Sequence, residues 1–109
     1  MKTSELTGAA LDWAVAKCEG ADYLSAHKDG FAIEYFSYST DWAQGGPIIE
    51  RQKIGLREPH KTPDVWYGRV TADVTVFMKS GPTPLIAAMR CFVASKLGEE
   101  VEIPKELTE

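Results

Sequence analysis

The sequence predicts an α+β domain, an α/β sandwich of three helices and a small antiparallel or mixed sheet of three or four strands, in the order α-β-α-β-β-α. Three observations predict it. Two segments near the ends of the chain repeat apolar residues at helical spacing. Three shorter segments are rich in aromatic and β-branched residues, which favour strands. The last two of these are too close together for a parallel crossover, so they must pair in antiparallel fashion or form one strand.

The first helix is expected over residues 7–18, with the hydroxyl of Thr7 as its N-cap. Leu6 and Leu11 have the spacing of a hydrophobic staple, which fixes the direction of the chain as it enters a helix. Asp12 falls off the apolar stripe and is expected to face solvent.

The last helix has the clearest boundaries. Thr83 is a suitable N-cap, Pro84 occupies the first helical position, and Gly98 follows the last turn. The residues between them form a dense apolar stripe, so this helix is expected to pack against the sheet.

Residues 31–37 are predicted to be a strand, because Phe31, Ile33 and Tyr35 alternate with other residue types. Residues 55–64 are polar and contain two prolines, which indicates a loop. Residues 65–70 and 74–78 then form either a hairpin or one long bent strand.

The middle helix has two alternative starts. It begins near Thr40 and bends at Pro47, or a turn precedes a helix whose first residue is Pro47. In both cases Ile48 and Ile49 are expected to face the core.

The composition is that of an ordinary globular chain, with 44% hydrophobic and 26% charged residues among 109. No stretch approaches the roughly 20 apolar residues that span a bilayer, and the first residues do not resemble a secretory signal. We therefore expect a cytoplasmic protein with no membrane partner. Cys18 and Cys91 are expected to be reduced core thiols, and neither has a second metal ligand at a suitable spacing.

The net charge of −4 is concentrated at the end of the chain. The last eleven residues contain five glutamates and one lysine, so residues 1–98 are neutral overall. Residues 1–104 are expected to form one domain and residues 105–109 a frayed acidic tail. A neutral body is poorly suited to duplex nucleic acid, which proteins bind mainly through lysine and arginine, so nucleic acid is not the expected partner.

The start of the middle helix is the candidate ligand site. Free N–H groups and the helix dipole favour an anion there, two glycines allow a ligand close to the backbone, and an indole could stack on a planar ring. The structural alternative is a capped helix with a bend and a packed tryptophan. The candidate residues are Thr40, Asp41, Trp42, Gln44, Gly45, Gly46 and Glu50.

Two further residues are candidates for the same site. Arg90 could bind a carboxylate or phosphate, or pair with Asp41 or Glu50, whereas its structural alternative is a solvated arginine whose stem covers the core edge. Trp66 could share a recognition surface with Trp42, although aromatic residues at a strand start usually serve packing.

A group of basic residues surrounds the predicted loop. Acidic residues within the same segment dilute its charge, so a solvated loop is expected, with contact to a phosphate or an acidic partner as the alternative. The basic residues are Arg51, Lys53, Arg57 and Lys61.

Three stretches together, residues 3–16, 39–51 and 81–90, resemble the NinX-like family of small proteins from lambdoid phages and prophages, and more broadly phage α-β-α sandwich domains. The resemblance implies a phage or prophage accessory protein inside a bacterial cell. It implies no activity, because the family is one of unknown function.

The sequence thus favours a non-catalytic binding protein that holds a small anionic or planar ligand, or a host or phage protein, through residues 39–50. No catalytic set, cofactor motif or metal site is predicted, because no paired carboxylates and no serine–histidine–aspartate set stand at a telling spacing. A nucleic-acid-associated protein and an enzyme of unrecognised type are the alternatives. The oligomeric state is open, and a homodimer is one option.

Overall fold

The computed structural model describes residues 1–107. The predicted α+β class is confirmed, with a three-stranded antiparallel sheet in the order β1-β2-β3. One short helix and the first strand are additional to the predicted order, and a second short helix replaces the strand predicted at residues 31–37. The elements are η1 (Thr3–Glu5), α1 (Gly8–Cys18), α2 (Tyr23–Lys28), α3 (Ala32–Tyr35), α4 (Trp42–Gln52), β1 (Gly55–Arg57), β2 (Trp66–Ala72), β3 (Thr75–Gly81), α5 (Pro84–Leu97) and η2 (Lys105–Leu107).

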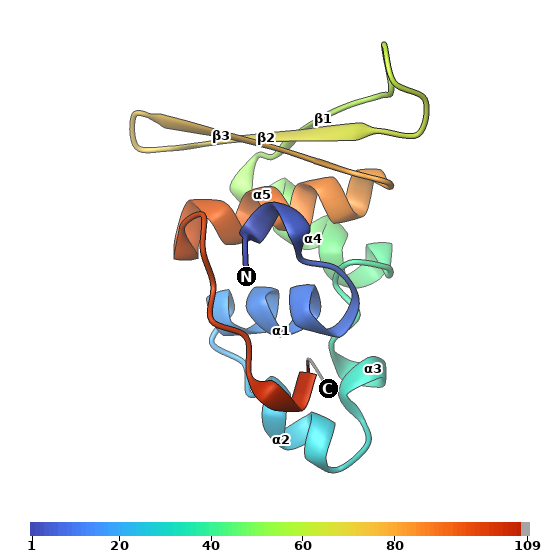
Figure 1. Ribbon diagram of the computed structural model, residues 1–109, viewed down its shortest axis with the longest axis vertical. Coiled ribbons are helices and arrows are strands. Elements are labelled where there is room, and N and C mark those ends of the chain that lie inside the picture. Colours follow the sequence, from blue (N-terminus) through green and yellow to red (C-terminus); the bar gives the residue numbers. More distant parts are fainter. Residues whose placement is uncertain (108–109) are drawn as a thin grey trace.

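The sheet, α5 and α1 form successive layers (Figure 1). Helix α5 covers one face of the sheet, and α1 packs on the other side of α5. Helices α2 and α3 and the η2 turn lie at the end of the molecule farthest from the sheet. The core fills the space between these layers, and its largest fully buried side chains include Phe92, Leu6, Leu11, Ile48 and Met89.

Strands β2 and β3 form a hairpin, which resolves the two alternatives for this segment. Trp66 pairs with Gly81 at one end and Ala72 with Thr75 at the other, so only Asp73 and Val74 lie in the turn. Asp73 has a φ of 55°, a left-handed conformation that aspartate tolerates in tight turns.

Glycines allow α5 to lie directly on the sheet. A Cβ atom at Gly68 would be 2.9 Å from the carbonyl oxygen of Ala87, and one at Gly81 would be 2.9 Å from the Ala87 amide nitrogen. Both contacts are with backbone, which cannot move aside as a side chain can. The close contact between α5 and the sheet therefore requires glycine at these two sheet positions.

Helix α5 has the predicted boundaries. The hydroxyl of Thr83 accepts a hydrogen bond of 3.1 Å from the Ile86 amide, Pro84 is the first helical residue, and Gly98 is the C-cap. Helix α1 also occupies its predicted range, but Thr7 makes no side-chain cap. Gly8 follows at a φ of 55°, so the first turn lacks the regular geometry that a threonine cap requires.

Helix α4 starts at Trp42 with Asp41 as its N-cap, and it contains Pro47. This agrees with the alternative in which the helix begins near Thr40. Pro47 has no N–H to donate to the carbonyl of Ala43, one turn earlier. Both residues are exposed, so water can serve that carbonyl.

The predicted strand at residues 31–37 is wrong. The segment contains α3, and the Phe36 amide donates to the carbonyl of Ala32 at 2.7 Å. Ala32 is buried and Phe36 stacks on Tyr23 of α2, with ring centroids 5.6 Å apart. The inward residues are thus four apart, as in a helix, and not two apart.

The predicted loop at residues 55–64 is partly wrong, because Gly55–Arg57 pairs with β2 as an edge strand. At the end of the described chain, Lys105–Leu107 forms a 3-10 turn, and Leu107 packs against the small cluster around Tyr23. Of the predicted acidic tail, residues 108–109 lie outside the described residues.

Candidate functional site

Three amides at the start of α4, those of Ala43, Gln44 and Gly45, are already bonded within the protein. The Asp41 carboxylate accepts from the Ala43 amide at 2.9 Å. The Asp41 carbonyl accepts from the amides of Gln44 and Gly45 at 3.0 and 2.9 Å. These are three of the donors on which the predicted anion site depends, and they are already satisfied by the chain itself.

Gln44 and Gly45 serve the fold. The Gln44 side-chain oxygen accepts a hydrogen bond of 2.8 Å from the Ser37 amide. Gly45 is buried, and a Cβ atom there would be 2.5 Å from both the Tyr38 carbonyl oxygen and the Cδ1 of Leu85. Glycine is therefore required for α4 to approach α5, and not for the approach of a ligand.

Trp42 retains an exposed surface. Its side chain borders a hollow of about 210 Å³ between the start of α4 and the start of α5. Thr40 belongs to this hollow, whereas Gly46 and Glu50 line a separate surface depression further along α4. The remaining lining residues of the Trp42 hollow are Ser39, Thr83, Leu85 and Ile86.

Arg90 and Trp66 do not line the hollow beside Trp42. The Nε of Arg90 donates to the Leu6 carbonyl at 2.7 Å, and its Nη1 donates to the Ser80 carbonyl at 2.9 Å. Arg90 therefore joins the segment before α1 to β3, and burial lowers the pKa of its guanidinium. Trp66 lies in β2 opposite Gly81, on the face that packs against α5.

Exposed apolar side chains gather in the segment just before and at this helix start. Phe31 is 47% exposed, Ile33 82%, Tyr35 62% and Trp42 52%. Three of these residues come from the segment predicted to be a strand, and two of them, Phe31 and Tyr35, lie side by side with ring centroids 6.1 Å apart. We call Phe31, Ile33, Tyr35 and Trp42 the apolar surface.

A buried acid lies beneath the turn that leads to Trp42. Asp12 is 8% exposed, contrary to the expected solvent position, and its carboxylate accepts from the Ser39 amide at 2.9 Å. Burial raises the pKa of Asp12, while the Ser39 amide and the nearby Ser39 hydroxyl act in the opposite direction. That hydroxyl lies near the carboxylate without the geometry of a hydrogen bond.

The cysteines are free thiols, as predicted. Burial raises the pKa of both Cys18 and Cys91 to about 11, so both are protonated at neutral pH. The thiol of Cys91 lies 3.1 Å from the Phe77 carbonyl, to which it donates. Neither thiol has the character of a nucleophile.

Residues 1–107 contain neither a candidate metal site nor a candidate membrane-spanning helix. No group of three or more histidine, cysteine, aspartate or glutamate side chains there could hold a metal ion. No helix in that range is long and apolar enough to cross a bilayer.

The fold and this region define a small α+β protein with an apolar surface at the start of its fourth helix. The chain belongs to the phage family described as Bacteriophage P22, NinX, whose family model matches residues 2–96. The resemblance of residues 3–16, 39–51 and 81–90 is thereby confirmed. No curated protein matches the chain.

Proposed function

We propose that this NinX-family phage accessory protein is a non-catalytic binding protein, and that its apolar surface contacts a protein partner in the cytoplasm of the infected bacterium. The observation that carries the proposal is the exposure of four large apolar side chains within residues 31–42. Exposed apolar groups of this density mark interaction sites in soluble proteins. Tryptophan and tyrosine are also the residues that contribute most to protein interfaces.

A protein side chain suits the hollow beside Trp42 better than an anion does. Leu85 and Ile86 supply apolar walls, and no lysine or arginine lines the hollow. The amides of Ala43, Gln44 and Gly45 already have acceptors. An anion would therefore find neither a cation nor a free donor among these groups, whereas an apolar side chain would bury surface on both sides.

Binding without catalysis fits the roles of the nearby polar groups. Asp12 holds the Ser39 amide, Asp41 caps α4, and Gln44 holds the Ser37 amide. Each of these groups is committed to a hydrogen bond that positions the backbone. A protein that acts by binding to a partner needs a complementary surface and no catalytic group.

A site-specific cross-linker tests this proposal in infected cells. Benzoylphenylalanine replaces Trp42 or Ile33 in two variants, and Val74 in a control, because Val74 is 96% exposed in the distant β2–β3 turn. We expect irradiation to give one discrete adduct from positions 42 and 33 and none from position 74. Adding Tyr35→Ser to the position-42 variant should weaken that adduct.

Two results would overturn the proposal. Equal cross-linking from position 74 would show that the adducts reflect random encounter. An adduct with the mass of two copies of this chain would assign the apolar surface to a homodimer instead of a foreign partner.

A further inference from the structure

The sheet has an outer face that no helix of residues 1–107 covers. Gly68 and Val70 of β2 face α5, because a Cβ at Gly68 would touch Ala87 and Val70 is 3% exposed. Alternate residues of a strand point to opposite faces, so the residues between them point outward together with their cross-strand partners. The outward positions are Gly55, Arg57, Tyr67, Arg69, Thr71, Val76, Met78 and Ser80.

Within residues 1–107 no helix lies over this face, and only the loop after β1 rises above one end of it (Figure 1). Val76 and Met78 are 46% and 56% exposed there, and Tyr67 is half-buried. An antiparallel sheet can present one face to water, but that face is then usually polar. Here the middle of the face combines a phenol ring, a thioether and two guanidinium groups.

The outward positions include two arginines and no carboxylate. The guanidinium groups of Arg57 and Arg69 make no hydrogen bond or ion pair within residues 1–107. The other two arginines are engaged, since Arg51 pairs with Glu19 at 2.6 Å and Arg90 binds two carbonyls. The uncommitted guanidinium groups are therefore gathered on one face of the sheet.

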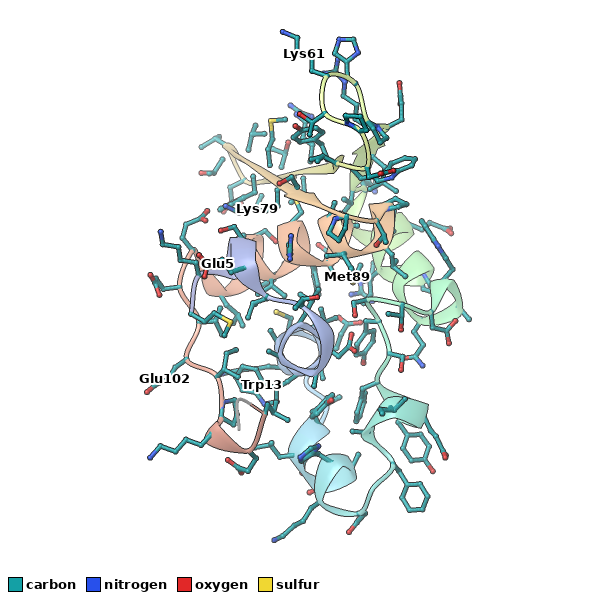
Figure 2. All side chains as sticks on the ribbon, turned by 45° about the vertical axis from the view of Figure 1, so that its right-hand side comes forward. Glu5, Trp13, Lys61, Lys79, Met89 and Glu102 are labelled. Atoms are coloured by element: carbon teal, nitrogen blue, oxygen red, sulfur yellow. The ribbon has the colours of Figure 1, made fainter. Side chains whose placement is uncertain are left out.

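The loop that follows β1 extends this basic surface. Arg57, His60, Lys61, Tyr67 and Met78 line a hollow of about 210 Å³ at the junction of the loop and the sheet. Figure 2 shows Lys61 on that loop, at the end of the molecule beyond the sheet. A phenol ring at the floor of a hollow with cations on its walls can accept a planar group joined to an anion.

The composition of the face selects its partner. A second copy of the same face would bring arginine against arginine with no carboxylate between them, which disfavours self-association. Duplex nucleic acid is bound through many phosphate contacts, and this face offers few cations. A single strand needs fewer, because unpaired bases stack on aromatic rings and on guanidinium planes while neighbouring phosphates take the charges.

We propose that the outer sheet face binds single-stranded nucleic acid, with Tyr67 stacking on a base and Arg57, Lys61 and Arg69 contacting phosphates. Glu58 and Asp64 belong to the same loop as Lys61 and reduce its net charge. The proposed phosphate contacts are thus limited to the three cations named above. The logarithm of the binding constant should fall with the logarithm of salt concentration with a slope of about −2, at roughly 0.7 for each phosphate neutralised on a single strand.

The test is a fluorescence-anisotropy titration of the full chain with labelled oligothymidylate and oligouridylate across a salt series. We expect measurable binding of both strands and weaker binding of a duplex of equal length. Tyr67→Ala should weaken single-strand binding by about 5- to 100-fold, and Tyr67→Phe should retain it. Arg69→Gln should make the salt slope about 0.7 shallower.

Two exposed residues outside the face provide matched controls. Tyr35→Ala removes an exposed phenol from α3, and Lys28→Gln removes an exposed charge from α2. Neither should change affinity for the strands. Because Tyr35 belongs to the apolar surface, failure of the protein-partner proposal leaves this measurement unaffected, and the reverse also holds.

Three outcomes would overturn the inference. The first is the absence of single-strand binding at low salt, and the second is binding that is unchanged in both Tyr67→Ala and Arg69→Gln. The third is equal affinity for a polyglutamate peptide that Tyr67→Ala leaves intact, which would assign the face to an acidic protein segment. Circular dichroism of Tyr67→Ala separates lost stacking from lost fold, and Arg69→Gln, at an exposed position, tests the face if Tyr67→Ala does not fold.

Discussion

The carboxylate of Asp12 in α1 accepts a hydrogen bond of 2.9 Å from the backbone amide of Ser39, which lies 27 residues later in the chain. The bond fixes the turn before α4 against α1, and Ser39 is 2% exposed. It therefore sets the position of Trp42 relative to the core. The arrangement has a cost, because burial raises the pKa of Asp12 above its usual value of 3.8.

This pKa shift predicts how Asp12→Asn changes stability with pH. A raised pKa in the folded state means that the stability contributed by the protonated acid is complete below about pH 3.8 and is lost as pH rises through the folded-state pKa. Asparagine keeps an oxygen acceptor for Ser39 and cannot ionise. The free energy of unfolding of Asp12→Asn minus that of the wild type should therefore increase from acidic to neutral pH, measured by urea denaturation.

Asp12→Ala provides the comparison. It leaves the Ser39 amide buried without an acceptor, so it should lower the free energy of unfolding by about 1–3 kcal/mol at neutral pH. A pH-independent difference between Asp12→Asn and the wild type would contradict the assigned titration.

The two glycines of α4 should respond in opposite ways to alanine. A Cβ atom at Gly45 would meet the Tyr38 carbonyl at 2.5 Å, so Gly45→Ala should destabilise by about 1–3 kcal/mol. The nearest atom to a Cβ at Gly46 is the Cε3 of Trp42 at 4.0 Å. Gly46→Ala should therefore stabilise by up to about 1 kcal/mol through helix propensity. Thermal denaturation of both variants checks the pair, and destabilisation by Gly46→Ala would show that α4 does not hold its helical form.

Arg90→Lys should be destabilising although it conserves charge. The guanidinium reaches the carbonyls of Leu6 and Ser80 at once, and an ammonium group cannot match that fork. We expect a loss of about 1–3 kcal/mol in the free energy of unfolding, measured in urea. Arg69→Lys is the control, since Arg69 is exposed on the outer sheet face, and it should be close to neutral. Equal stability of both variants would mean that the Arg90 bonds contribute nothing net.

Two methionines test the placement of the core. Met89 is fully buried on α5 between the sheet and α1, so Met89→Ala should cost about 2–5 kcal/mol by leaving a cavity. Met78 is 56% exposed on the sheet, and Met78→Ala should change stability by less than about 0.5 kcal/mol. Chemical denaturation with a constant m-value is the appropriate measurement. Similar effects at both positions would mean that α5 is rotated from the face described.

Local signals predicted the elements whose boundaries are set within a few residues. Thr83, Pro84 and Gly98 delimit α5 because cap, first-turn and stop residues act over one helical turn. The short distance between residues 65–70 and 74–78 excluded a parallel crossover but left a hairpin and one bent strand open, and the observed register decides for the hairpin. The start of α4 was open because Pro47 could belong to either alternative, and the Asp41 cap decides it.

The elements that the sequence did not predict depend on tertiary contacts. Residues 31–37 alternate as a strand does, but the stacking of Phe36 on Tyr23 selects a helical turn. Helix α2 has one local signal, its N-cap Asp22, whose carboxylate accepts a hydrogen bond of 3.1 Å from the Ser25 amide. β1 is three residues long and is defined only by pairing with β2, which no local pattern specifies.

The candidate site, like the fold, was predicted from the sequence only in part. Trp42 was identified from its position at a helix start, and the structure leaves it half exposed beside a hollow. The roles of Gly45 and Arg90 could not be read from the sequence, because they depend on tertiary contacts with Leu85 and Leu6, which are distant in the chain. The outer sheet face required the register of β2 and β3 to be known.

The contacts of Thr3 bear on how the protein is made. Its hydroxyl donates to the Gly98 carbonyl at 2.6 Å, and its amide donates to the Glu99 carbonyl at 2.9 Å. A ribosome synthesises Thr3 some 95 residues before these partners. The emerging chain must therefore keep its leading segment undocked until Gly98 and Glu99 have been synthesised, so these two hydrogen bonds can form only after α5 has left the exit tunnel.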